Sequence, residues 1–347
     1  MKLLKWMLVA CVAASVVACS TAPKNQKLVK GPATVQYKDQ VEVKYLGGGG
    51  VLLKRGDDMV MTAPYFSNIT PLQQLLPTRS KFDRIDNGLP DDVNNLEAIL
   101  VPGSHFYRTM DLPYIADSRA PNAVIYGGET TKHLLAPVFE KSRLVSLNEM
   151  AATGSVPGEW VYTKNRHIRF MAIDTDQASA ASGQSMLAGG KLTDDLSSMP
   201  RLPRSYPEGE IFAYVIDFLN QDGGIAFRAY YQDAVSHQGM GYLPDFDKQD
   251  QAPVDVALMA VTGFNKVDTY PFSILRNVQP KQIVAIRWEN INRSQADPVR
   301  EAASGDLEEF QKRVRIASQA PVKVPSPGAS IAFRVQSGSD AIQTAAK

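Results

Sequence analysis

The stretch at residues 96–116 constrains the fold of this chain most, because a short apolar run there ends in a cluster of polar side chains. Residues 98–101 are apolar and β-prone, a pattern typical of a buried strand. The run stops at Pro102-Gly103, a turn signal, and residues 104–108 follow as Ser-His-Phe-Tyr-Arg. Layered α/β proteins place their functional groups at the carboxyl ends of strands. We therefore expect an α/β domain with its site beside this cluster.

The N-terminus has the pattern of a bacterial export signal. Lys2 and Lys5 precede an apolar segment at residues 6–17 that is too short to cross a membrane. Residues 16–19, Val-Val-Ala-Cys, resemble a lipobox, in which the cysteine is acylated and becomes the mature N-terminus. The alternative is an ordinary secretory signal. We predict lipidation at Cys19, with membrane lipid as the partner of that residue.

The domain organisation follows from this signal and from the polar segments at both ends. We predict residues 1–19 as a lipoprotein signal peptide, 20–32 as a tether, 33–336 as one domain and 337–347 as a disordered tail. Ser20, where an Asp would favour retention, indicates sorting to the outer membrane. We expect a lipid-anchored domain in the bacterial cell envelope that faces the periplasm.

Cysteine content and net charge exclude several classes of function. Cys11 and Cys19 are the only cysteines and both lie in the signal, so the mature chain can form neither a disulfide nor a cysteine-ligated metal site. The net charge of +1 gives no indication of nucleic-acid binding. The length is ample for one large hydrophobic core.

Alternating apolar and polar residues predict many strands. A glycine run at residues 47–50 joins the first two strands of an opening meander, and no Lys-Ser/Thr helix start follows it, so it is not a phosphate-binding loop. We expect helices at residues 131–139 and 271–277. The predicted strands lie at residues 41–45, 51–54, 59–62, 98–101, 123–126, 144–147, 160–163, 167–173, 210–218, 224–231, 255–261 and, as the last core strand, 282–286.

The polar cluster after residue 101 resembles the signature of the metallo-β-lactamase-fold hydrolases, His-x-His-x-Asp-His. On that motif Gly103 takes the first His position and His105 the second, while Tyr107 takes the Asp position and Arg108 the third His position. Further matches place Gln177 on the next metal-binding His, Asp233 on the metal-bridging Asp and Arg287 on the last His.

The resemblance extends over about residues 40–295 and implies an α/β fold, the metallo-β-lactamase-like four-layer αββα sandwich. Residues 33–336 would then form a metallo-β-lactamase-like domain. The alternation of strands and helices alone would also fit a generic two-layer α/β domain.

The number of metal ligands at the matched positions determines whether the resemblance implies metal-dependent hydrolysis. A catalytic zinc site needs about three protein ligands, and only His105 and Asp233 remain at matched positions. Arginine cannot deprotonate to coordinate a metal, but Arg108 or Arg287 can neutralise the carboxylate of Asp233. We predict a relic site without metal or other cofactor, made of Gly103, His105, Tyr107, Arg108, Gln177, Asp233 and Arg287.

Two alternatives stay open. The two arginines, His105 and Tyr107 could form a pocket for a small anionic ligand. A divergent metal-dependent hydrolase could instead hold one divalent metal, zinc, on His105, Asp233, Asp176 and His237. His133 and His167 are weaker candidates, and no Gly-x-Ser-x-Gly elbow is present. The favoured hypothesis is a membrane-anchored protein that binds a small anionic ligand or an envelope protein and does not hydrolyse a substrate.

Overall fold

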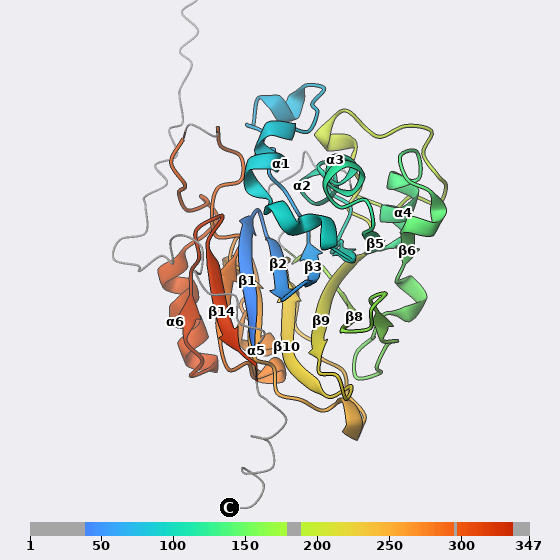
Figure 1. The fold of residues 1–347 in the computed structure, drawn as a ribbon. Coiled ribbons are helices and arrows are strands. Elements are labelled where there is room, and N and C mark those ends of the chain that lie inside the picture. The colour runs from blue at the N-terminus through green and yellow to red at the C-terminus, as the bar shows by residue number, and fades with distance from the viewer. Residues whose placement is uncertain (1–38, 179–188, 295–296, 336–347) are drawn as a thin grey trace, which may run out of the picture.

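The computed structural model describes residues 39–178, 189–294 and 297–335. Within these residues the chain forms two seven-stranded sheets with helices packed outside them (Figure 1). The layers therefore follow the order helix, sheet, sheet, helix, which confirms the predicted αββα sandwich. The predicted signal peptide, lipidation at Cys19, tether and tail fall outside the described residues.

The first sheet has the strand order β14-β1-β2-β3-β4-β5-β6. β1, β2 and β3 form the predicted antiparallel meander, and β3 to β6 run parallel to one another. β14 pairs antiparallel with β1, although the sequence pattern predicts no strand beyond residue 286. The bounds are β1 (Gln40–Gly47), β2 (Gly50–Arg55), β3 (Asp58–Thr62), β4 (Ala98–Leu100), β5 (Val124–Gly127), β6 (Leu144–Ser146) and β14 (Ser330–Arg334).

The second sheet has the strand order β13-β12-β11-β10-β9-β8-β7. β7 to β10 are antiparallel to their neighbours, whereas β10 to β13 are parallel. All the strands predicted in this half of the chain are present, and β13 is an addition. The bounds are β7 (Val161–Tyr162), β8 (Ile168–Thr175), β9 (Ile211–Leu219), β10 (Ile225–Gln232), β11 (Val256–Ala260), β12 (Ile283–Ile286) and β13 (Val322–Lys323).

Short helices cover the outer face of the first sheet. Ile85, Leu112 and Leu135 share one core cluster with residues of β3, β4 and β5. The helices of this side are α1 (Phe82–Gly88), α2 (Phe106–Thr109), α3 (Leu112–Tyr114) and α4 (Glu129–Leu135). The predicted helix at residues 131–139 is thus α4, which begins and ends earlier.

Two helices contribute to the core cluster of the second sheet. Residues of α5 (Phe272–Val278) and α6 (Leu307–Ala317) pack with β11 and β12 in one cluster. α5 matches the predicted helix at 271–277, while α6 is a further element beyond the predicted helices. No helix in the described ranges is long and apolar enough to cross a membrane.

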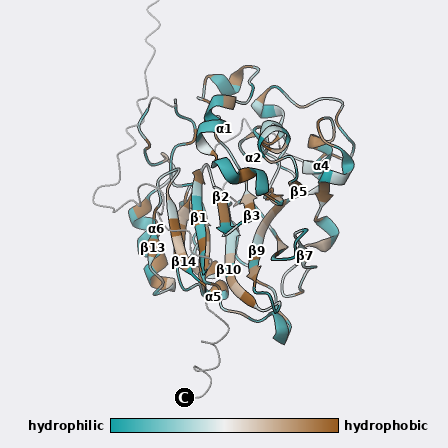
Figure 2. Cartoon of the chain, viewed as in Figure 1, coloured by the Kyte–Doolittle hydropathy of each residue, from teal (hydrophilic) through white to brown (hydrophobic). Residues whose placement is uncertain are grey.

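The main core lies between the two sheets. All nine residues of β9 are buried, as expected for a central strand covered on both faces. In β1 the buried and partly buried positions alternate, which places Val41, Val43 and Tyr45 in the main core. Figure 2 shows the same distribution, with hydrophobic residues on the strands and hydrophilic residues on many outer helices and loops.

Candidate functional site

Three predicted site residues follow strands that run in the same direction. β8 and β10 are both antiparallel to β9, and β12 is parallel to β10 through β11. Their carboxyl ends therefore lie at one edge of the second sheet. Gln177, Asp233 and Arg287 come at or just after these ends, so the topology directs them toward one region.

The segment after β4 reaches the same edge from the first sheet. The backbone N–H of Phe212, at the start of β9, donates to the carbonyl of Pro102 at 3.1 Å. The N–H of Ser104 donates to the carbonyl of Glu208 at 2.8 Å. These bonds join the loop before α2 to the second sheet, so that Arg108 on α2 lies beside the end of β10.

Asp233 is held by two arginines. Nε of Arg108 donates to Oδ2 of Asp233 at 2.7 Å, and Nη1 of Arg287 donates to Oδ1 at 2.8 Å. The same Nη1 also donates to the backbone carbonyl of Asp233 at 2.9 Å. The side chains of Arg108 and Asp233 are fully buried, and that of Arg287 is 9% exposed. Both oxygens of this carboxylate therefore receive charge-assisted hydrogen bonds.

Electrostatics within the cluster stabilise both guanidinium charges. Burial is the largest single influence on the pKa of Arg287 and lowers it, but the carboxylate of Asp233 and the hydroxyl of Tyr107 together outweigh burial, so the pKa is raised. Arg108 shows the same balance, and its pKa is also raised. The ring of Tyr107 lies close to both, with its centroid 5.1 Å from Cζ of Arg108 and 4.7 Å from Cζ of Arg287. The cluster thus carries two positive charges and one negative charge.

Gly103 makes room for the side chain of Arg108. A Cβ atom at residue 103 would lie 2.5 Å from Nη1 of Arg108 and 2.7 Å from Cδ1 of Ile211. Any larger residue would displace the guanidinium or the strand end. The glycine at residue 103 and the arginine at residue 108 therefore fit each other sterically.

The glycine run at residues 47–50 packs directly on the ion pair. Gly49 has a φ of +97°, and a Cβ there would lie 2.8 Å from both Cγ of Arg287 and Oδ1 of Asp233. The hydroxyl of Tyr231 donates to the carbonyl of Gly49 at 3.0 Å and fixes the turn. The glycines therefore allow the backbone of this turn to lie close to the side chains of the relic site.

Arg287 itself has a left-handed backbone, with a φ of +48°. Its N–H donates to the hydroxyl of Tyr45 at 2.9 Å, and its carbonyl accepts from the N–H of Thr262 at 3.0 Å. Such a conformation is costly for a residue other than glycine. The surrounding hydrogen bonds hold it, and the side chain is directed back onto Asp233.

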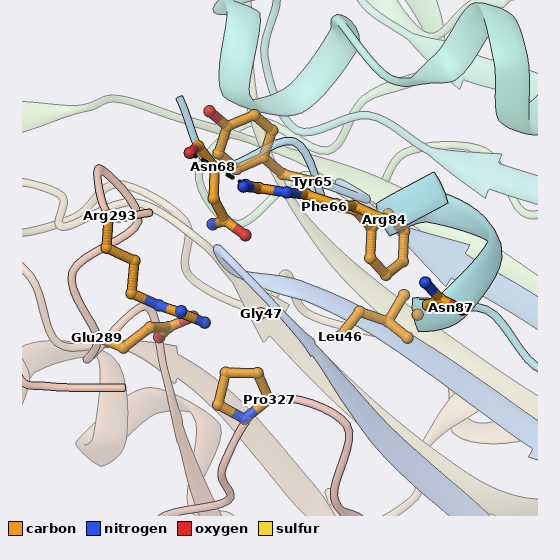
Figure 3. Close-up of a pocket in the computed structure, with 11 residues that line it drawn as sticks. Leu46, Gly47, Tyr65, Phe66, Asn68, Arg84, Asn87, Glu289, Arg293 and Pro327 are labelled. Carbon is orange, nitrogen blue, oxygen red and sulfur yellow. Dashed lines mark hydrogen bonds between the residues drawn. The ribbon is translucent and has the colours of Figure 1, made fainter. Parts of the chain in front are cut away.

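A second feature lies on the other side of the glycine run. The Tyr45 hydroxyl that accepts from Arg287 donates to Oε2 of Glu289 at 2.5 Å, and the N–H of Gly48 donates to Oε1 at 2.7 Å. Glu289 lines a cavity of about 170 Å³ that also contacts Gly47, Arg84 and Arg293 (Figure 3). No local sequence pattern predicts this cavity, because its walls come from segments far apart along the chain.

Comparisons with known proteins agree with the fold. A metallo hydrolase from the archaeon Ignicoccus hospitalis superposes with a TM-score of 0.52 at 12% sequence identity, over 86% of this chain and 100% of that chain. A metallo-β-lactamase-fold protein from Bacillus subtilis, YhfI, gives a TM-score of 0.49 at 11% identity, over 85% and 100% of the two chains. No protein-family model matches the chain, and no curated protein matches its sequence.

The likeness to the Ignicoccus protein agrees with the strand order and the αββα layers described above. The chain has the metallo-β-lactamase fold. At such low identity the likeness extends to the fold alone, so the chemistry must be judged on the residues at the site.

The metal that the metallo-β-lactamase fold implies does not fit the donor set of this chain. Both oxygens of Asp233 already accept from arginines, and guanidinium groups cannot coordinate a cation. His105 contributes Nδ1 to a contact of 3.1 Å with the hydroxyl of Tyr107, to which Nε2 of Gln177 donates at 3.3 Å. Within the described ranges, no group of three or more His, Cys, Asp and Glu residues is placed to hold a metal.

The alternative metal ligands form a separate pair. Nδ1 of His237 lies 2.5 Å from Oδ2 of Asp176, and the N–H of His237 donates to Oδ1 at 2.9 Å. The His237 side chain is 65% exposed, unlike the buried Asp233. The predicted set of His105, Asp233, Asp176 and His237 is therefore not assembled into one metal-binding group in the part of the chain described.

Proposed function

We propose that this protein is a binding protein of the bacterial envelope that does not perform metal-dependent hydrolysis. It uses the metallo-β-lactamase fold as a scaffold and binds a small anionic ligand or an envelope protein. The single observation that carries the proposal is the occupation of both Asp233 oxygens by Arg108 and Arg287.

The energetics of the cluster support this proposal. A divalent cation at Asp233 would have to break two buried charge-assisted hydrogen bonds. Each guanidinium would also repel it by roughly 8 kcal/mol at a separation of about 4 Å and an effective dielectric constant of about 20. A catalytic zinc site needs about three protein ligands, and among the described residues no group of three or more His, Cys, Asp and Glu side chains is placed to hold a metal.

The predicted lipid anchor gives the proposal its location. Acylation at Cys19 would tether the domain through residues 20–32 to the outer membrane, facing the periplasm. Two acyl chains suffice for stable anchoring, because each buried methylene contributes about 0.8 kcal/mol. A binding protein held at this surface would meet small ligands and envelope proteins in the periplasm.

Elemental analysis of the purified protein tests the proposal. The full chain is expressed in medium that contains zinc, iron and manganese, dialysed without chelator, and analysed for all three metals. We expect much less than one metal ion per chain. The Arg287→His variant should behave in the same way, because Gly103, Arg108 and Gln177 would still lack ligands. One equivalent of any of these metals in the wild-type protein would refute the proposal and favour a divergent hydrolase.

A further inference from the structure

The cavity behind the glycine run has the features of a small binding site. Its volume is about 170 Å³, below the roughly 300–1,000 Å³ of typical drug-sized ligand sites. It therefore suits a ligand of a few heavy atoms. It is separate from the relic site, because Gly47 faces Glu289 while Gly49 faces Arg287 and Asp233.

Two arginines from distant segments line this cavity. Arg84 lies on α1, and its Nη1 donates to the carbonyl of Ser67 at 2.7 Å. Arg293 follows β12, and its Nη1 donates to the carbonyl of Asp297 at 3.0 Å. Nε of Arg293 is buried and has no hydrogen-bond partner among the described residues. A buried donor of this kind is costly unless it meets an acceptor, and the positive charges of the two arginines favour an acceptor that is anionic.

Glu289 supplies hydrogen-bond acceptors, whereas the two arginines supply donors. It is 4% exposed, and its two oxygens accept from the Tyr45 hydroxyl and the Gly48 N–H. A carboxylate offers about four acceptor positions, so further positions are free to accept from a ligand. Figure 3 shows Glu289 beside Arg293 on one wall and Arg84 on the opposite wall.

The remaining walls are partly apolar. Leu46, Phe66 and Pro327 contribute carbon atoms, and Asn87 lies at the exposed end of α1. The cavity thus combines two positively charged hydrogen-bond donors, the buried acceptor Glu289 and an apolar surface. Its volume leaves space for only a few ligand atoms. A ligand matching it has a charged acceptor, a donor close to that acceptor and a short carbon chain.

We propose that this cavity binds a small carboxylate that carries a hydroxyl or ammonium group on the adjacent carbon. The carboxylate lies between Arg84 and Arg293, and the hydroxyl or ammonium donates to Glu289. This inference rests on the proposed role as a binding protein and adds the site and the ligand class. It involves no residue of the relic site.

Three probes of nearly equal size test this inference. L-Alanine, L-lactate and propionate share a three-carbon carboxylate and differ in the adjacent ammonium, hydroxyl or hydrogen. Binding of each to the full-length protein is measured by isothermal titration calorimetry, with inorganic phosphate as a fourth probe. We expect saturable binding of alanine or lactate that is about tenfold or more tighter than that of propionate, because only propionate leaves Glu289 without a donor.

Variants place the binding in the cavity. Arg84→Gln and Arg293→Gln should each weaken the best probe about tenfold or more, since each removes a charge-assisted donor. Asn87→Trp, at an exposed rim position, should block the cavity without disturbing the arginines. Arg315→Gln, on the exposed side of α6, is the matched control and should leave affinity unchanged.

The outcomes separate this inference from the proposed function. Absence of saturable binding by alanine and lactate, equal binding of propionate, or binding of phosphate alone would overturn the ligand class. Binding that survives Arg84→Gln, Arg293→Gln and Asn87→Trp would overturn the site. None of these results would change the metal content of the protein, which tests the proposed function separately.

Discussion

Gly49 and Asp233 lie in contact across the two sheets, such that a Cβ at residue 49 would come within 2.8 Å of Oδ1 of Asp233. The turn between β1 and β2 thus closes directly over the carboxylate at the end of β10. With Arg108 and Arg287 on its two oxygens, this carboxylate is enclosed by protein groups. Substitutions at these residues should therefore change the free energy of unfolding.

Asp233→Asn should destabilise the protein more than Arg287→Ala. The first change leaves two buried guanidiniums without a carboxylate, and loss of a buried ion-pair partner typically costs about 3–5 kcal/mol. The second leaves Asp233 paired with Arg108, so we expect a cost of about 1–3 kcal/mol. Urea unfolding of both variants measures the difference. An Arg287→Ala variant as unstable as Asp233→Asn would show that Arg108 does not share the charge.

Gly49→Ala should cost more stability than Gly56→Ala. Both positions have positive φ, of +97° and +63°, so each alanine brings backbone strain of about 1–2 kcal/mol. Only Gly49 faces atoms of the ion pair, which adds about 1–3 kcal/mol of overpacking, whereas nothing lies within 4 Å of a Cβ at residue 56. Equal unfolding free energies for the two variants would contradict the close packing over Asp233.

The strand pattern and the matched positions of the relic site could be predicted from sequence because both signals are local. Alternation or a short apolar run marks each strand, and polar residues at the strand ends mark the site. The contact of Arg287 with Asp233 could also be predicted, since parallel strands bring their carboxyl ends together. The motif positions predict that Arg108 or Arg287 neutralises Asp233, and in the structure both arginines form ion pairs with it.

Other features could not be predicted because they depend on contacts between distant segments. The role of the glycine run requires the register of β1 against β2 and the position of β10. The cavity unites Arg84 on α1 with Glu289 and Arg293 after β12. β14 is a short strand that gains stability from pairing with β1. The amphipathic pattern of α6, with Leu307, Phe310 and Val314 buried, is by contrast local, and the helix was predictable from the sequence.

Stability should fall steeply at alkaline pH. Burial raises the pKa of Tyr214 and likewise of Tyr45, Tyr230 and Tyr231. These side chains stay protonated in the folded state while their unfolded counterparts ionise near pH 10. Their contribution is therefore complete below about pH 10 and is lost as the pH rises further, by about 1.4 kcal/mol per pH unit for each tyrosine.

Tyr214→Phe isolates one of these groups. Its unfolding free energy should fall with pH less steeply than that of the wild type, by about 1.4 kcal/mol per pH unit above pH 10. Loss of the hydrogen bond to the carbonyl of Val101 lowers stability at every pH and leaves the slope unaffected. Denaturant titrations between about pH 9 and about pH 11 give both quantities. An unchanged slope would mean that Tyr214 ionises in the folded protein.

Cys19→Ser should release the protein from membranes. The wild-type protein should sediment with the membrane fraction, because diacylation supplies two buried chains. The variant should remain uncleaved or become soluble, since serine cannot be acylated through a thioether. Fractionation of cells expressing each form, with immunodetection, measures the distribution. A soluble periplasmic wild-type protein would instead support an ordinary secretory signal.

Zinc titration of the chelator-treated wild-type protein tests the central claim most directly. The claim is that Arg108 and Arg287 occupy the coordination positions of Asp233 and leave no centre for a metal. Calorimetry at pH 7 should therefore show no stoichiometric binding of micromolar or tighter affinity, and weak heats at most from exposed pairs such as His237 with Asp176. Saturable binding of one zinc ion per chain, abolished by Asp233→Asn, would contradict the account.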